Sequence, residues 1–68
     1  MEAYVIANNE NTEFIGRDAA SGGYPWVTDL LSSAYIGSYD TIVRYYDVIR
    51  DKDRFSVKRI VLEDISMD

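Results

Sequence analysis

The 68-residue chain has no cysteine and no histidine. It therefore cannot form a disulfide, a thiolate or imidazole zinc site, or a catalytic centre that uses cysteine or histidine. A metal site would need oxygen ligands alone, which suit Mg²⁺ or Ca²⁺. We expect no metal, no other cofactor and no catalysis.

Long apolar segments are missing as well. No run approaches the roughly 20 apolar residues that a membrane-spanning helix needs. The N-terminus lacks the basic stretch followed by an apolar stretch that marks a secretory signal. These absences predict a cytoplasmic protein with no membrane association.

Basic residues are scarce in the first two-thirds of the chain. Residues 1–43 hold six acids against one base, Arg17, whereas residues 44–68 hold six acids and six bases. The whole net charge of −5 thus lies in residues 1–43, which argues against binding nucleic acid or an anionic membrane there. Five bases fall between Arg50 and Arg59, but Asp51 and Asp53 separate them. That pattern favours a solvated sheet edge over a nucleic-acid surface.

A chain this short forms one domain, residues 1–68, and buries only about 60% of its unfolded surface. Six tyrosines, two phenylalanines and one tryptophan are available to fill its core. A tyrosine packs its ring while its hydroxyl stays hydrated, which suits both a small domain and a binding surface. The surplus of tyrosine also predicts a homodimer.

The first half of the chain predicts short extended segments. Residues 3–7 and 12–15 are typical strands, and the asparagine-rich turn at residues 8–11 would join them into a hairpin. Trp26 and Val27 form a further short extended segment. Thr28 or Asp29 is expected to cap a single helical turn through Ser32.

The second half predicts a helix and a strand. Ser38 is a good N-cap, and the residues spaced as an apolar helical stripe up to about Arg50 are Ile42, Tyr45, Tyr46 and Ile49. Residues 55–62 form a strand whose alternation breaks at Lys58 and Arg59, which indicates a bulge or an edge position. Residues 63–68 form an acidic tail that we expect to fray. Together these elements predict an α+β fold, with three or four antiparallel strands packed on one helix.

The most distinctive segment is residues 21–26, Ser-Gly-Gly-Tyr-Pro-Trp. It predicts a recognition loop in which Tyr24 and Trp26 anchor a partner, since these residue types dominate interface energetics. The alternative is a tight turn whose Trp26 fills the core. The candidate binding residues are Arg17, Asp18, Gly22, Gly23, Tyr24, Trp26 and Asp29. Asp18 and Asp29 could also serve as paired catalytic carboxylates, but a turn and a cap are simpler roles.

Several of these pieces together resemble a group of short uncharacterised proteins encoded by phages and prophages. The matching pieces are Tyr4–Ile6, Glu13–Asp18, Ser21–Trp26, Thr28–Leu30, Ala34 and a helix opened by Ser38. The resemblance covers roughly residues 4–50. It implies a phage or mobile-element origin and carries no mechanism with it.

The sequence thus predicts a small acidic interaction protein, non-catalytic and phage-derived, that binds and inhibits a host or phage protein. One alternative is a domain that binds a nucleotide-like or aromatic ligand with the Gly-Gly-Tyr-Pro-Trp loop and uses Arg17 for an anionic group. Another is a purely structural homo-oligomer.

Overall fold

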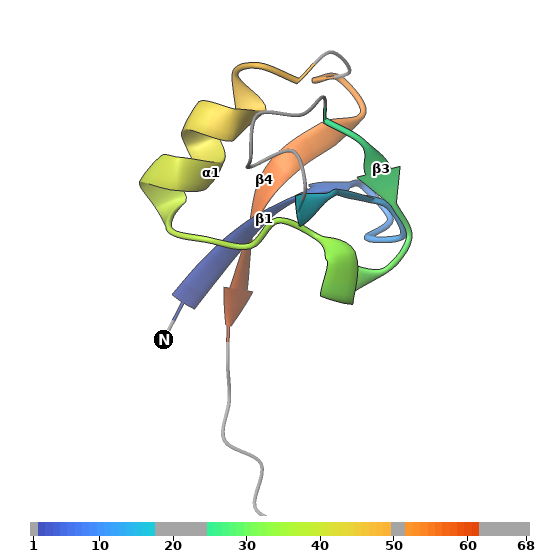
Figure 1. The fold of residues 1–68 in the computed structure, drawn as a ribbon, viewed down its shortest axis with the longest axis horizontal. Helices are drawn as coiled ribbons and strands as arrows, with labels where there is room; N and C mark the ends of the chain where they lie inside the picture. Colours follow the sequence, from blue (N-terminus) through green and yellow to red (C-terminus); the bar gives the residue numbers. More distant parts are fainter. Residues whose placement is uncertain (1, 18–24, 50–51, 62–68) are drawn as a thin grey trace, which may run out of the picture.

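A computed structural model describes residues 2–17, 25–49 and 52–61. In this part of the chain, four strands form one antiparallel sheet in the order β3-β2-β1-β4. The elements are β1 (Glu2–Asn8), β2 (Phe14–Ile15), β3 (Val27–Thr28), the 3₁₀ turn η2 (Leu31–Ser33), α1 (Tyr39–Tyr46) and β4 (Phe55–Val61). One helix packs against this sheet, which confirms the predicted α+β class (Figure 1). No helix in the described ranges is long and apolar enough to cross a membrane.

The hairpin of β1 and β2 forms as predicted, and Asn8 organises its turn. The Asn8 side-chain carbonyl accepts hydrogen bonds from the amides of Thr12 and Glu13 at 2.9 and 3.0 Å. Asn11 adopts a φ of 60°, a conformation that asparagine tolerates better than most residues. The Lys58 ammonium donates to the Asn8 carbonyl oxygen at 2.7 Å and to Asn11 Oδ1 at 2.6 Å. Hydrogen bonds of the Asn8 side chain and of Lys58 in β4 therefore stabilise the turn.

Strand β4 is an edge strand without a bulge. It pairs with β1 in unbroken register from Glu2 opposite Val61 to Asn8 opposite Phe55. The edge position is confirmed and the alternative of a bulge is wrong. Lys58 and Arg59 are successive residues, so their side chains point to opposite faces of the sheet. Each has a polar partner on its own face, so the apolar alternation breaks without a bulge. Arg59 approaches the Glu2 carboxylate at 3.5 Å.

Helix α1 begins where the sequence predicts and ends earlier. The Ser38 hydroxyl accepts a hydrogen bond from the Thr41 amide at 3.4 Å and so caps the helix. The prediction of a helix to about Arg50 is wrong, since α1 ends at Tyr46. The next turn tightens, and Ile49 donates to the carbonyl three residues earlier. Ile49 still reaches the core and is only 5% exposed.

Buried apolar side chains form two clusters. The cluster that includes the helix consists of Ile6, Ile15, Ile42, Ile49 and Phe55. The other consists of Val5, Ala7, Phe14 and Ala34. Strand β1 supplies both clusters because its side chains alternate between the two faces of the sheet. Both faces of β1 are therefore buried from Val5 to Asn8.

The segment between η2 and α1, which the sequence left ambiguous, lies against the ends of two strands. Ala34 forms an isolated bridge with Gly16, just after β2, and Gly37 forms one with Tyr4 in β1. The Tyr4 and Gly37 amides each donate to the other residue's carbonyl, at 2.9 and 3.1 Å. This arrangement holds η2 next to the end of β2.

Candidate functional site

Large apolar side chains remain exposed at the end of the sheet formed by β3 and η2. The exposed fractions are 37% for Trp26, 43% for Val27, 57% for Leu30 and 46% for Leu31. We call these four residues the β3–η2 surface. Figure 1 shows β3 and η2 on the side of the molecule away from α1. Sequence reasoning identified only Trp26 of the four.

Strand β3 forms an outer edge of the sheet, which gives this surface its shape. It pairs with β2 on one side, and the Gly16 amide donates to the Trp26 carbonyl oxygen at 2.8 Å. Trp26 and Val27 are successive residues of an extended segment, so their side chains point to opposite faces. The apolar surface therefore wraps around a sheet edge instead of lying on one face.

The Trp26 ring lies directly over Gly16. A Cβ atom added at Gly16 would come within 2.6 Å of Trp26 Cδ2 and 2.5 Å of Cζ2, far inside normal contact distance. Only glycine therefore allows the ring to rest on the backbone of residue 16, just after β2. The ring is neither a fully buried core residue nor a detached one, because it covers Gly16 and keeps more than a third of its surface exposed.

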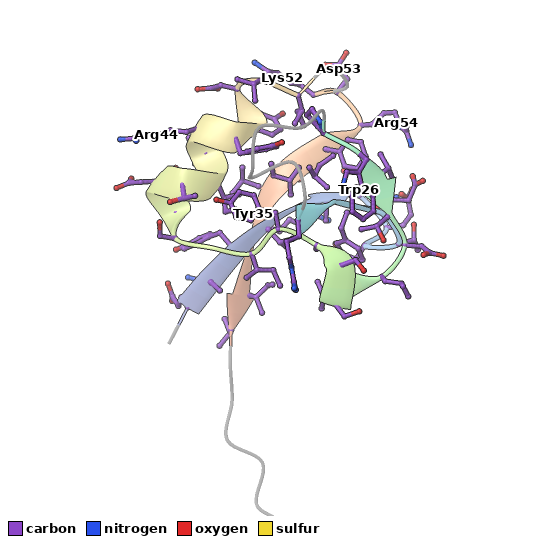
Figure 2. The ribbon with its side chains drawn as sticks, in the orientation of Figure 1. Trp26, Tyr35, Arg44, Lys52, Asp53 and Arg54 are labelled. Carbon is purple, nitrogen blue, oxygen red and sulfur yellow. The ribbon has the colours of Figure 1, made fainter. Side chains whose placement is uncertain are left out.

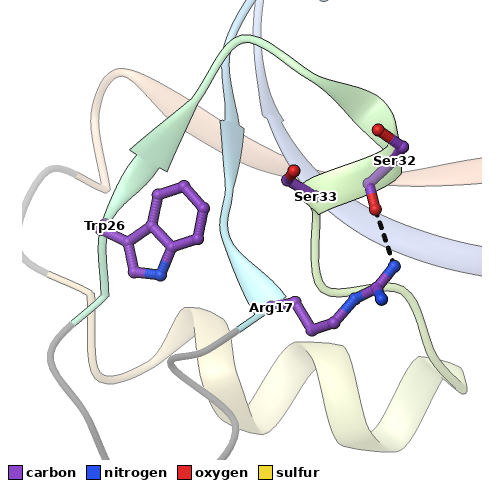
Figure 3. A pocket seen from close by; sticks show the side chains of 4 residues that line it. All are labelled: Arg17, Trp26, Ser32 and Ser33. Atoms are coloured by element: carbon purple, nitrogen blue, oxygen red, sulfur yellow. Dashed lines mark hydrogen bonds between the residues drawn. The ribbon is translucent and has the colours of Figure 1, made fainter.

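A hollow of about 260 Å³ lies beside this ring (Figure 3). Its described lining consists of Arg17, Trp26, Ser32 and Ser33. Arg17 Nη2 donates to the backbone carbonyl oxygen of Ser32 at 2.7 Å, which holds the exposed guanidinium against η2. The hollow thus combines one cation, an aromatic side chain and two hydroxyl groups.

The bend before η2 differs from the predicted cap. The turn comprises Leu31–Ser33 and has no side-chain cap at Leu30. The Thr28 hydroxyl instead accepts a hydrogen bond from the Leu30 amide at 3.2 Å. A threonine hydroxyl reaches an amide two residues ahead, so it closes the bend at the end of β3 instead of starting a helix. Asp29 is exposed and caps nothing.

Three of the predicted binding residues lie in the described part of the chain. Arg17 and Trp26 line the same hollow, and Asp29 is exposed on the segment that leads to η2. The other four, Asp18, Gly22, Gly23 and Tyr24, lie outside the described residues. Sequence reasoning missed the pair Leu30-Leu31 and the pair Ser32-Ser33. Two leucines inside the predicted single helical turn, followed by two serines, were the available signal.

Three described basic residues of the second half, Arg54, Lys58 and Arg59, have partners in the β1–β2 hairpin. Arg54 forms an ion pair with Glu13 at 2.8 Å, and Lys58 bonds to the turn. The Lys52 ammonium lies 5.9 Å from the centre of the Tyr46 ring. Figure 2 shows Lys52 and Arg54 at one end of the molecule and Arg44 on the helix, apart from Trp26. These positions match the solvated edge that the sequence predicts.

The described residues whose pKa values are shifted, Tyr4 and Tyr45, do not line the hollow. Burial raises the pKa of the Tyr45 hydroxyl, and Tyr35 adds to this effect. Burial also raises the pKa of Tyr4, with a further contribution from the Glu2 carboxylate. Both tyrosines belong to edge-to-face ring pairs, Tyr35 with Tyr45 and Tyr4 with Tyr39. In the described ranges, no three acidic side chains gather closely enough to hold a metal ion.

Comparison of the chain with family models, with curated proteins and with solved structures found no match.

Proposed function

We propose that this chain is a non-catalytic interaction protein whose β3–η2 surface binds a partner protein. Eight large apolar side chains are exposed in the described part of the chain, and four of them fall within the six residues 26–31. Scattered exposed apolar residues are normal, whereas a gathered set is typical of an interaction site. This gathering is the observation that carries the proposal.

The composition of the surface also suits protein binding. Tryptophan is enriched among the residues that contribute most to binding, and it contributes best at the centre of a patch that excludes water. Trp26 is fixed in place by Gly16, so it loses little freedom when a partner covers it. Val27, Leu30 and Leu31 would add apolar contacts along the same edge of the sheet.

The charge of the chain favours a partner with a basic surface. Residues 1–43 carry the net charge of −5, and a complementary field increases the association rate more than the affinity. Raising the ionic strength should therefore slow association, because charges are screened over about 8–10 Å at physiological salt. The resemblance to phage and prophage proteins makes a host or phage protein in the bacterial cytoplasm the candidate partner, with inhibition as the outcome.

The hollow gives less support to a small-molecule function. Pockets for drug-sized ligands span roughly 300–1,000 Å³, whereas this hollow has about 260 Å³. A nucleotide-like ligand would leave much of its surface in water. A single side chain of a partner protein fits the space better.

The test is affinity capture with the tagged full-length chain in a bacterial lysate, followed by mass spectrometry. Leu31→Asp places a charge on the β3–η2 surface and should reduce capture of the partner at least tenfold. Val48→Asp is the matched control, because Val48 is also an exposed apolar residue (65%) but lies just after α1, outside the β3–η2 surface. Circular dichroism should show that both variants are folded.

The proposal fails if the Leu31→Asp chain captures the same proteins in the same amounts as the unchanged chain. It also fails if Val48→Asp abolishes capture and Leu31→Asp does not, since the contact surface would then lie elsewhere.

Self-association is part of the same proposal, because a second copy could cover the β3–η2 surface when no other partner is present. Sedimentation at tens of micromolar should then give a mass above the 7.8 kDa of one chain. Leu31→Asp should return the protein to the monomer mass. A mass of 7.8 kDa for the unchanged chain would remove the homodimer and leave the heterologous partner untouched.

A further inference from the structure

The floor and walls of the hollow are fixed by backbone contacts. Gly16 lies between its two sides, since its amide bonds to Trp26 and it bridges to Ala34, which follows η2. Ser32 and Ser33 belong to η2, and Arg17 bonds to the Ser32 carbonyl oxygen. Figure 3 shows Trp26 on one side and the two serines on the other, with Arg17 reaching toward Ser32. The hollow is therefore formed before any partner arrives.

The lining supplies mainly hydrogen-bond donors. An arginine guanidinium has five N–H groups, and the described hydrogen bond of Arg17 uses one, on a neutral carbonyl oxygen. The indole N–H of Trp26 is a donor only, and the serine hydroxyls can also donate. None of the described lining residues is acidic. Such a set of groups favours an anion.

Docking on the β3–η2 surface would also remove water from Arg17. This residue lines the same hollow as Trp26, so a partner side chain that fills the hollow lies against both the ring and the guanidinium. A charge that is removed from water is costly unless an opposite charge pairs with it. The partner must therefore bring an anion to this position.

We infer that the hollow binds a carboxylate of the partner protein, while an apolar side chain next to that carboxylate packs on Trp26. This inference rests on the proposed function. A carboxylate matches the planar fork of an arginine with two parallel hydrogen bonds. One carboxylate also neutralises one arginine, whereas a phosphate dianion would leave extra negative charge in a chain of net charge −5. The partner surface is then basic around a single carboxylate.

Small acylated peptides test this inference without the partner. N-acetylphenylalanine presents a terminal carboxylate beside a ring, and N-acetyl-aspartyl-phenylalaninamide presents a side-chain carboxylate beside a ring. N-acetylphenylalaninamide is the neutral control, and inorganic phosphate tests the other anion. Trp26 is the only tryptophan, so its fluorescence reports binding at the hollow itself. We expect dissociation constants of about 1 mM for the better carboxylate peptide, as small ligands give.

Two arginine variants separate local pairing from overall charge. Arg17→Gln keeps a donor for the Ser32 carbonyl oxygen and loses the positive charge, so it should weaken carboxylate binding about tenfold or more. Arg44→Gln removes the same charge from α1, on a part of the molecule apart from Trp26 (Figure 2), and should leave binding unchanged. The neutral amide should bind at least tenfold more weakly than the carboxylates, and equally to all three proteins. The tighter of the two carboxylate peptides shows whether a chain end or an acidic side chain is preferred.

The inference is overturned by any of four results: neither carboxylate peptide binds, the neutral amide binds as tightly, Arg17→Gln has no effect, or phosphate binds more tightly than both carboxylates. The capture experiment separates this failure from failure of the proposed function. If Leu31→Asp loses the partner and Arg17→Gln retains it, the proposed interaction surface stands and the carboxylate inference is wrong. If Leu31→Asp still captures the same lysate protein, the proposed function is wrong, and that protein is not the source of the carboxylate.

Discussion

Replacing Gly16 by alanine should push the Trp26 ring away from β2 and destabilise the domain. The new Cβ would lie 2.5–2.6 Å from two ring carbons, whereas carbon atoms pack best at about 3.5–4.0 Å. The ring must therefore move by about 1 Å or more. Overpacking of this kind costs about 1–3 kcal/mol, and alanine regains about 0.5–1 kcal/mol over glycine within a strand. A net loss of about 1–2 kcal/mol in the free energy of unfolding is expected.

Urea denaturation followed by circular dichroism measures the loss, and the emission spectrum of the single tryptophan reports the ring. Emission should shift to longer wavelength as the displaced ring becomes more exposed. Gly37→Ala is the matched control, because its Cβ would lie 3.8 Å from the nearest side-chain atoms, in ordinary contact. That variant should leave both the stability and the emission almost unchanged.

A double-mutant cycle gives the decisive comparison. In the Trp26→Ala background the obstacle is gone, so Gly16→Ala should be neutral or slightly stabilising. If Gly16→Ala destabilises the protein equally with and without Trp26, the ring does not rest on Gly16. The described geometry of the hollow would then be wrong.

Three further predictions concern the core, the turn and the pH dependence. Ile42 is the fully buried residue of α1, so Ile42→Ala should lower the free energy of unfolding by about 2–5 kcal/mol in urea denaturation; an unchanged urea midpoint would mean that α1 does not pack on the sheet. Asn8→Ala leaves the amides of Thr12 and Glu13 without their acceptor and should cost about 1–3 kcal/mol by the same assay, whereas a cost near zero would show that water replaces the side chain. The pKa of the Tyr4 and Tyr45 hydroxyls is raised in the folded state, chiefly by burial. The unfolded chain therefore loses these protons first, and stability should fall as the pH rises above about 10. Tyr45→Phe should flatten that fall in urea midpoints measured from pH 8 to 11, and an unchanged slope would contradict the assignment.

Local sequence determined the elements whose signals lie within a few residues. The helical spacing of Ile42, Tyr45, Tyr46 and Ile49 predicts the buried side of α1, and Ser38 predicts its start because a cap needs one side chain and the next few amides. The asparagine-rich turn predicts the hairpin for the same reason, since Asn8 closes it with its own side chain. The end of α1 was not predictable in this way. Ile49 keeps its place in the stripe in a tightened turn, so the apolar pattern is the same whether or not the helix continues.

The candidate site depends on contacts between segments distant in sequence, which no local pattern specifies. Gly16 and Trp26 become neighbours because β3 pairs with β2, and Arg17 meets Ser32 because residues 34–37 hold η2 against the strand ends. No local pattern shows that residue 16 must lack a side chain so that the ring of Trp26, ten residues later, can pack on it. Nor could the pair Leu30-Leu31 be recognised as exposed, since a leucine is exposed or buried according to what the rest of the chain leaves uncovered. Local patterns in the chain predict the hairpin, the start of α1 and the residue types available for binding, whereas the pairing of β2 with β3 determines which of those residues meet.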